Sequence, residues 1–202
     1  MKIITVDREF GSGGRELGKR LADALNIPCY DQEVIEEVAK LHGLDPHHVE
    51  HISETDIHTV YPRTIGRHFA IPHFASNDTV KVAIAQQEVV KKLAGQGDCV
   101  IVGHGADIVL WGEKTMNIFV YADHASKLER CLSRAAEGET ETDICRQMKL
   151  IDKNRAIYHE LLTDTKWGRK ESYHLCINTS GRNIKTLVPL LAAYVSGWFE
   201  ND

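Results

Sequence analysis

The stretch KIITVDREFGSGGRELGKRL, residues 2–21, constrains the fold most, because a strand, a glycine-rich turn and a helix follow one another in it. Residues 3–6 are apolar, and Leu17, Leu21 and Leu25 recur at a spacing of four, the period of one helix face. Backbone amides at the start of a helix can surround a phosphate, and glycines there tolerate positive φ and close approach. The candidate nucleotide-binding residues are therefore Gly11, Ser12, Gly13, Gly14, Arg15 and Glu16.

This turn departs from the usual P-loop pattern G-x-x-x-x-G-K-[ST] at three positions. Glu9 stands at the first glycine, Arg15 at the lysine and Glu16 at the hydroxyl residue. The planar guanidinium of Arg15 could neutralise a β- or γ-phosphate, which makes Arg15 a candidate catalytic residue. The carboxylate of Glu16 would repel phosphates unless a metal ion lies between them.

Two other interpretations of the turn remain open. It could be a strand-to-helix turn that binds no ligand. It could also be a dinucleotide fingerprint, since Asp31 follows about 20 residues later. The fingerprint G-x-G-x-x-G, however, requires its last glycine where Glu16 stands.

Short apolar runs alternate with longer segments of helical period along the rest of the chain. The predicted strands are residues 3–6, 28–30, 99–103, 117–121 and 173–177. The predicted helices are one that ends at Asn26 and others over residues 31–41, 79–93, 126–136, 141–162 and 184–199. Such alternation is typical of a parallel sheet covered on both faces. We therefore expect an α/β fold of three layers.

Residues 43–78 differ from their surroundings, with three prolines and weak periodicity, and we interpret them as a segment inserted into one domain. Arg63 and Arg67, four residues apart, are candidates for binding an acceptor phosphate, with an exposed helix face as the alternative. Seven of the eleven histidines fall between His42 and His73. We predict no metal site among them, since at most His47 and His51 share a helix face and no H-E-x-x-H motif is present.

Composition bounds the location and the partners of the protein. The N-terminus lacks a signal-peptide pattern, and no apolar run approaches the roughly 18 residues of a membrane helix. The five widely spaced cysteines form no C-x-x-C motif. We expect a cytoplasmic protein with reduced cysteines. The net charge of −5 argues against a dedicated nucleic-acid surface but not against a local basic pocket for phosphates.

Five segments, in one order and over nearly the whole chain, resemble the cytidylate kinase-like family. They are REFGSGG at 8–14, YD at 30–31, VIVGHGAD at 100–107, IDKNRAIY at 151–158 and YHLCINTS at 173–180. Two positions depart from the family pattern. His104 replaces an arginine, which removes a permanent charge, and His174 replaces an aspartate.

The resemblance implies a P-loop NTPase fold of the nucleoside monophosphate kinase type. It implies a five-stranded parallel sheet, an inserted monophosphate-binding segment, a helical lid over residues 126–162, and ATP with Mg²⁺ as the donor. Asp31, His104, Asp152 and Arg155 would then belong to the acceptor site, the last two as a D-x-x-R motif. Arg130 and Arg134 would correspond to the lid arginines.

Two functional hypotheses follow. The first is an ATP-dependent phosphotransferase that acts on a nucleoside monophosphate or a related small phosphorylated acceptor. The second is a nucleotide-binding or regulatory protein on the same scaffold that has lost catalytic turnover, and the altered loop favours it. The aromatic C-terminal helix, with Tyr194, Trp198 and Phe199, could supply an oligomer contact.

Overall fold

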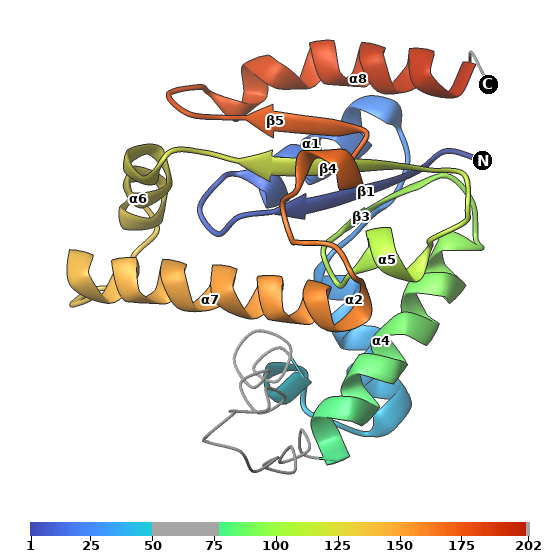
Figure 1. Cartoon of the computed structure of the whole chain (residues 1–202), viewed down its shortest axis with the longest axis horizontal. Coiled ribbons are helices and arrows are strands. Elements are labelled where there is room, and N and C mark those ends of the chain that lie inside the picture. Colours follow the sequence, from blue (N-terminus) through green and yellow to red (C-terminus); the bar gives the residue numbers. More distant parts are fainter. Residues whose placement is uncertain (50–76, 201–202) are drawn as a thin grey trace, which may run out of the picture.

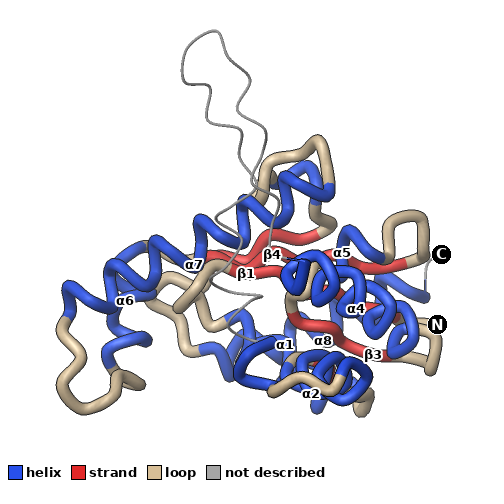
Figure 2. Tube along the Cα trace, turned by 90° about the horizontal axis from the view of Figure 1, so that it is seen from below, coloured by secondary structure: helices blue, strands red, loops and turns tan. Residues whose placement is uncertain are grey.

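The computed structural model describes residues 1–49 and 77–200. The strands are β1 (Ile3–Arg8), β2 (Cys29–Tyr30), β3 (Cys99–Val102), β4 (Thr115–Tyr121) and β5 (Leu175–Asn178). The helices are α1 (Gly14–Leu25), α2 (Gln32–His42), α4 (Asn77–Ala94), α5 (Ala106–Val109), α6 (His124–Leu132), α7 (Glu141–Leu162), the short 3₁₀ helix η2 (Lys170–Ser172) and α8 (Ile184–Glu200). Figures 1 and 2 show the helices on both sides of one sheet.

The five strands form a parallel sheet in the order β2-β3-β1-β4-β5. The central strand β1 pairs with β3 from Ile3 opposite Cys99 and with β4 from Ile3 opposite Thr115. Because all strands run the same way, their carboxyl ends meet at one edge, where ligands bind in open α/β sheets. The glycine-rich turn follows β1 at this edge, so the fold places it at the centre of the expected site.

Each face of the sheet carries its own core because successive residues of β1 point to opposite faces. Ile3 packs with α2, α4 and α5, whereas Ile4 and Val6 pack with α1 and α8. The α/β fold class with a five-stranded parallel sheet is thus confirmed.

Local signals explain where the helices begin and end. The expected helix over residues 141–162 is confirmed at both ends. At its start, a capping box forms between Thr140 and Asp143. Helix α1 ends at Leu25, one residue before the expected Asn26, which caps the helix in a left-handed conformation. The expected helix over residues 126–136 is displaced, because the Asp123 side chain accepts a hydrogen bond from the Ser126 amide and starts α6 at His124.

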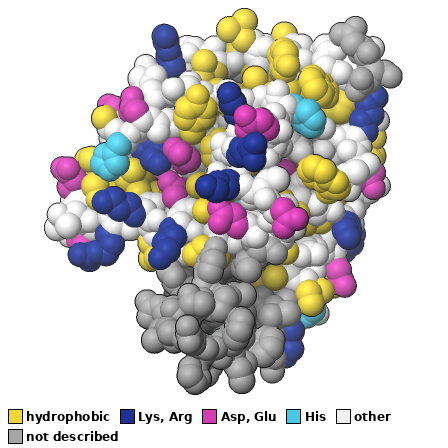
Figure 3. Space-filling view, viewed as in Figure 1, with side chains coloured by type: hydrophobic (Ala, Val, Ile, Leu, Met, Phe, Trp, Pro, Cys, Tyr) yellow, Lys and Arg dark blue, Asp and Glu magenta, His cyan; other side chains and the backbone are white. Residues whose placement is uncertain are grey.

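Several expectations about the surface stay predictions. Arg63 and Arg67 lie outside the described residues, as does most of the segment 43–78. On α8, Tyr194 is exposed, while Trp198 and Phe199 pack against the core, and nothing described shows a partner chain there. Basic and acidic side chains lie interspersed on the face drawn in Figure 3. Within residues 1–49 and 77–200, no helix is both long and apolar enough for a membrane span.

We predict that Gly18→Ala destabilises the protein, although alanine normally favours a helix over glycine by about 1 kcal/mol. A Cβ atom on Gly18 would lie 2.6 Å from a methyl group of Val102, because α1 lies directly on β3. We expect a net loss of roughly 1–2 kcal/mol in the free energy of unfolding, measured by urea denaturation. The control is Gly197→Ala in α8, where a Cβ meets open space and stability should hold or rise; equal effects at both positions would contradict the packing argument.

Candidate nucleotide-binding site

The glycine-rich turn connects the end of β1 to the start of α1. Gly11 and Gly13 have φ values of 77° and 83°, and Gly13 is the N-cap of the helix. Other residues would be strained there. The first hydrogen bond of the helix runs from the Leu17 amide to the Gly13 carbonyl. The amides of the opening turn therefore have no helical acceptor, as an anion site requires.

Arg15 and Asp31 form an ion pair beside this turn. Arg15 Nε contacts Asp31 Oδ2, and Arg8 approaches the other carboxylate oxygen at 3.9 Å. The side chain of Arg15 is 58% exposed and that of Asp31 only 16%, so the guanidinium stands at the mouth of the site. His104 Nε2 lies 2.9 Å from the main-chain carbonyl oxygen of Asp31, to which it can only donate. Arg15, predicted to bind the nucleotide, thus lies beside Asp31 and His104, predicted to bind the phosphoryl acceptor.

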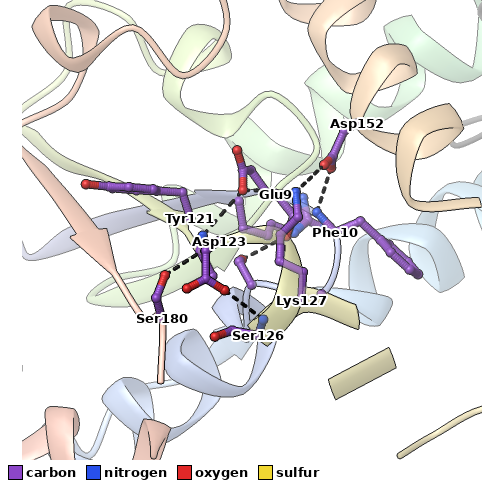
Figure 4. A network of polar contacts seen from close by, with 12 residues as sticks. Glu9, Phe10, Tyr121, Asp123, Ser126, Lys127, Asp152 and Ser180 are labelled. Carbon is purple, nitrogen blue, oxygen red and sulfur yellow. Dashed lines mark hydrogen bonds and ion pairs between the residues drawn. The ribbon is translucent and has the colours of Figure 1, made fainter. Parts of the chain in front are cut away.

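A second ionic cluster lies on the other side of the turn (Figure 4). Lys127 Nζ, from α6, contacts Glu9 Oε2 at 3.1 Å and Asp152 Oδ2 at 2.9 Å. The other oxygen of Asp152 accepts a hydrogen bond of 2.6 Å from the Phe10 amide. Burial alone would lower the pKa of Lys127, but the hydrogen bonds and charges of Asp152 and Glu9 outweigh burial and raise that pKa. Lys127 is therefore a permanent cation beside the turn.

Sequence reasoning did not single out Lys127. Asp123 at the N-cap of α6 was a readable signal for where the helix starts, and hence for Lys127 lying one turn inside it. No local pattern, however, shows that this turn of α6 touches the glycine-rich turn.

The other predicted arginines bind main-chain carbonyls or carboxylates. Arg155 donates to the Arg8 carbonyl at 3.0 Å and lies over the Phe10 ring. Arg130 donates to the Thr179 carbonyl at 2.6 Å and approaches the carbonyls of Gly11 and Ser12 at 3.4 Å. In this structure Arg130 therefore links the turn to the end of β5, and its role as a lid arginine stays a prediction.

Glu16 contacts two arginines. Its carboxylate contacts Arg20 at 2.8 Å and the exposed Arg134 at 3.5 Å. These pairs relieve the repulsion that a free carboxylate would exert on phosphates. They also engage the side chain that stands at the hydroxyl position of a P-loop, so Glu16 would have to leave both arginines to reach a metal ion.

Comparisons with known proteins support this geometry. The model of the cytidylate kinase-like family matches residues 3–181. The chain belongs to the cytidylate kinase-like family. A comparison with curated proteins gave no match.

Solved structures extend the comparison to the whole fold. An uncharacterized protein from Eubacterium ventriosum is 28% identical, with 97% of this chain and 99% of that chain covered and a TM-score of 0.69. Shikimate kinase from Bacteroides thetaiotaomicron is 14% identical, with 96% and 98% covered and a TM-score of 0.58. A gluconokinase from Sinorhizobium meliloti is 14% identical, with 99% and 94% covered and a TM-score of 0.54. This member of the family therefore has the fold of P-loop kinases.

In this cytidylate kinase-like protein, the half-buried Asp7 at the end of β1 lies close to the buried Asp107 and His159. The side-chain ligand atoms of Asp7, Asp107 and His159 lie within 4.8 Å of one another, a spacing at which they could hold a cation. Asp7, however, already accepts hydrogen bonds from the Trp167 indole at 2.6 Å and the Tyr173 hydroxyl at 3.1 Å. Burial and the nearby Asp7 charge raise the pKa of Asp107 to about 7. We interpret the cluster as an Asp107 that keeps its proton up to about pH 7, beside a hydrogen-bonded Asp7.

We predict that the stability of the wild type falls as the pH rises and that Asp107→Asn abolishes this fall. In the folded state Asp107 keeps its proton up to about pH 7, whereas its ordinary pKa is 3.8. The folded state therefore binds more protons between these values, and wild-type stability falls across this range. The asparagine variant should gain roughly 1–3 kcal/mol relative to wild type between pH 5 and pH 8.

Urea denaturation at each pH, in the presence of a chelator, measures this difference. His159, whose pKa is lowered by burial, lies with its Nδ1 atom 3.9 Å from Asp107 Oδ2, so the same comparison is repeated in a His159→Gln background. A difference in stability that stays constant from pH 5 to pH 8 would rule out the protonated carboxyl group.

Proposed function

We propose that this protein is an ATP-dependent phosphotransferase that moves the γ-phosphoryl group to a nucleoside monophosphate or a related small phosphorylated acceptor. The observation that carries the proposal is the opening turn of α1, whose amides face a site flanked by Arg15 and Lys127. Phosphoryl transfer asks a protein chiefly to hold two phosphates in line and to neutralise charge. Amides and cations at the edge of the sheet suit that task.

The residues on the two sides of the turn divide into donor and acceptor roles. The amides of Gly13, Gly14 and the residues that follow would hold the ATP phosphates. Asp31 and Arg155, supplied by separate elements, would orient the acceptor. Mg²⁺, when present, would arrive with the nucleotide and offset charge on its phosphate oxygens.

The transfer itself balances without a proton acceptor on the protein. An oxygen of the acceptor phosphate forms a bond to the γ-phosphorus, and the bond from that phosphorus to the β–γ bridging oxygen breaks. ADP leaves with the electron pair. Because the attacking oxygen is already anionic, positioning and charge neutralisation are the contributions required of the protein.

One observation favours the second candidate, a nucleotide-binding protein without turnover. In this structure the Phe10 amide already donates a hydrogen bond to Asp152, and Arg15 already forms an ion pair with Asp31. Both contacts would have to loosen for catalysis. Product formation distinguishes the two candidates.

We predict that ATP raises the thermal midpoint of the protein and that a suitable acceptor causes ADP release. A ligand at a hundred times its dissociation constant adds about 2.7 kcal/mol of stability, or roughly 5–10 °C for a domain of this size. The measurements are thermal shift with ATP, ADP, CMP and other monophosphates, with and without Mg²⁺, followed by an ADP assay. Stabilisation without ADP release for any acceptor would favour the binding protein, and no response to any nucleotide would end both candidates.

We predict that Arg15→Ala lowers the affinity for ATP by about tenfold, because one charge-assisted contact is lost. Its fold should survive, since the Arg15 side chain is 58% exposed. Calorimetric titration measures the affinity. The matched control is Arg146→Ala on α7, where the side chain is 76% exposed and pairs with Asp143 of the same helix. An equal loss of affinity in both variants would indicate a general effect of charge rather than a role for Arg15.

A further inference from the structure

An amide of the glycine-rich turn and a lysine from another helix converge on one anion. Asp152 Oδ1 accepts from the Phe10 amide at 2.6 Å, and Asp152 Oδ2 lies 2.9 Å from Lys127 Nζ. The two donors therefore bind the two oxygens of a single carboxylate (Figure 4). A phosphate group presents several oxygens in the same way and favours the same two kinds of donor.

The backbone of Lys127 packs closely against the glycine-rich turn, in addition to the ion pairs of its side chain. A Cβ atom added to Gly11 would lie 2.9 Å from the Lys127 carbonyl oxygen and 3.2 Å from its Cβ atom. Lys127 thus lies one helical turn into α6, at the point where α6 touches the glycine-rich turn. Its side chain is only 12% exposed and runs along the turn to Glu9.

The sequence of the turn explains why an ammonium group from elsewhere matters. Residues 7–16 contain no lysine, and Arg15 at the usual lysine position pairs with Asp31 at the mouth of the site. Glu9, which replaces the first glycine, is one of the two carboxylates that hold Lys127. The glutamate at the first glycine position is therefore paired with a lysine from α6.

We propose that Lys127 supplies the phosphate-binding ammonium group that the glycine-rich turn lacks, and that Asp152 holds the place of a phosphate in the ligand-free protein. This inference rests on the proposed function and deepens it. On ATP binding, Lys127 and the Phe10 amide exchange the Asp152 carboxylate for phosphate oxygens. During transfer, as the bond between the γ-phosphorus and the bridging oxygen breaks, Lys127 neutralises the charge that develops on ADP, and no proton moves.

The exchange predicts effects of opposite sign for the two partners of the pair. Lys127→Met removes a charge-assisted contact to the phosphates, and we expect ATP affinity to fall about tenfold to a hundredfold. Asp152→Asn removes the competing negative charge but keeps an oxygen for the Phe10 amide, and we expect ATP affinity to rise about threefold to tenfold. Calorimetric titration with ATP and Mg²⁺, without an acceptor, measures both.

Two further variants separate a ligand contact from a structural one. Lys153→Met removes an exposed lysine from the residue next to Asp152 and should change ATP affinity less than about twofold. The double variant Lys127→Met, Asp152→Asn removes both charges of the pair, which keeps the net charge and protects the fold. Compared with Asp152→Asn alone, it should bind ATP at least about tenfold more weakly.

The outcomes separate the inference from the proposed function. If wild type binds ATP and Lys127→Met, or the double variant relative to Asp152→Asn, binds equally well, Lys127 is not a phosphate ligand. If Asp152→Asn weakens ATP binding as Lys127→Met does, the pair only stabilises the turn and the inference is wrong, although the proposed function stands. If wild type binds no ATP, both fail.

Discussion

The carboxylate of Asp152 joins three separate parts of the chain at the end of β1. It lies on α7, accepts a hydrogen bond from the Phe10 amide of the glycine-rich turn, and forms an ion pair with Lys127 of α6. Arg155, one turn further along α7, binds the Arg8 carbonyl at the other end of the same segment. The conformation of the turn, and with it the direction of its amides, therefore depends on how α6 and α7 lie against it.

Three cations near the turn are each paired with a carboxylate from another part of the fold. Arg15 pairs with Asp31, Lys127 with Glu9 and Asp152, and Arg134 with Glu16. Of these cations Lys127 is the most buried, and leaving it unpaired would be strongly unfavourable. A phosphorylated ligand can replace the carboxylates as the anion, so ligand binding is an exchange of partners. The difference between the two sets of contacts, rather than their sum, sets the affinity.

The sequence predicted those parts of the molecule whose signals are local. The apolar β-branched runs indicated the strands, and the start of α7 was correct because helical period and polar flanks agree around Thr140. The predicted start of α6 was wrong because Asp123, two residues after β4, was not recognised as a helix-capping signal. The contact between Lys127 and the turn could not be predicted, since it depends on how α6 packs and on residues 25 and 118 positions away. Arg130 illustrates the same limit, because its spacing resembles a lid arginine while its partners are carbonyls of the turn and of β5.

The departures of the turn from the usual P-loop form one consistent set. Glutamate in place of the first glycine would be unfavourable beside a phosphate, but Glu9 contacts a lysine that only α6 could bring. Arginine in place of lysine cannot follow the same tight path, and Arg15 instead reaches outward to Asp31 at the acceptor side. Glutamate in place of the hydroxyl residue is turned toward Arg20 and Arg134. Each altered residue has a partner of opposite charge, from its own helix or from another element. The substitutions therefore depend on one another, and restoring a single P-loop residue would remove one contact from its partner.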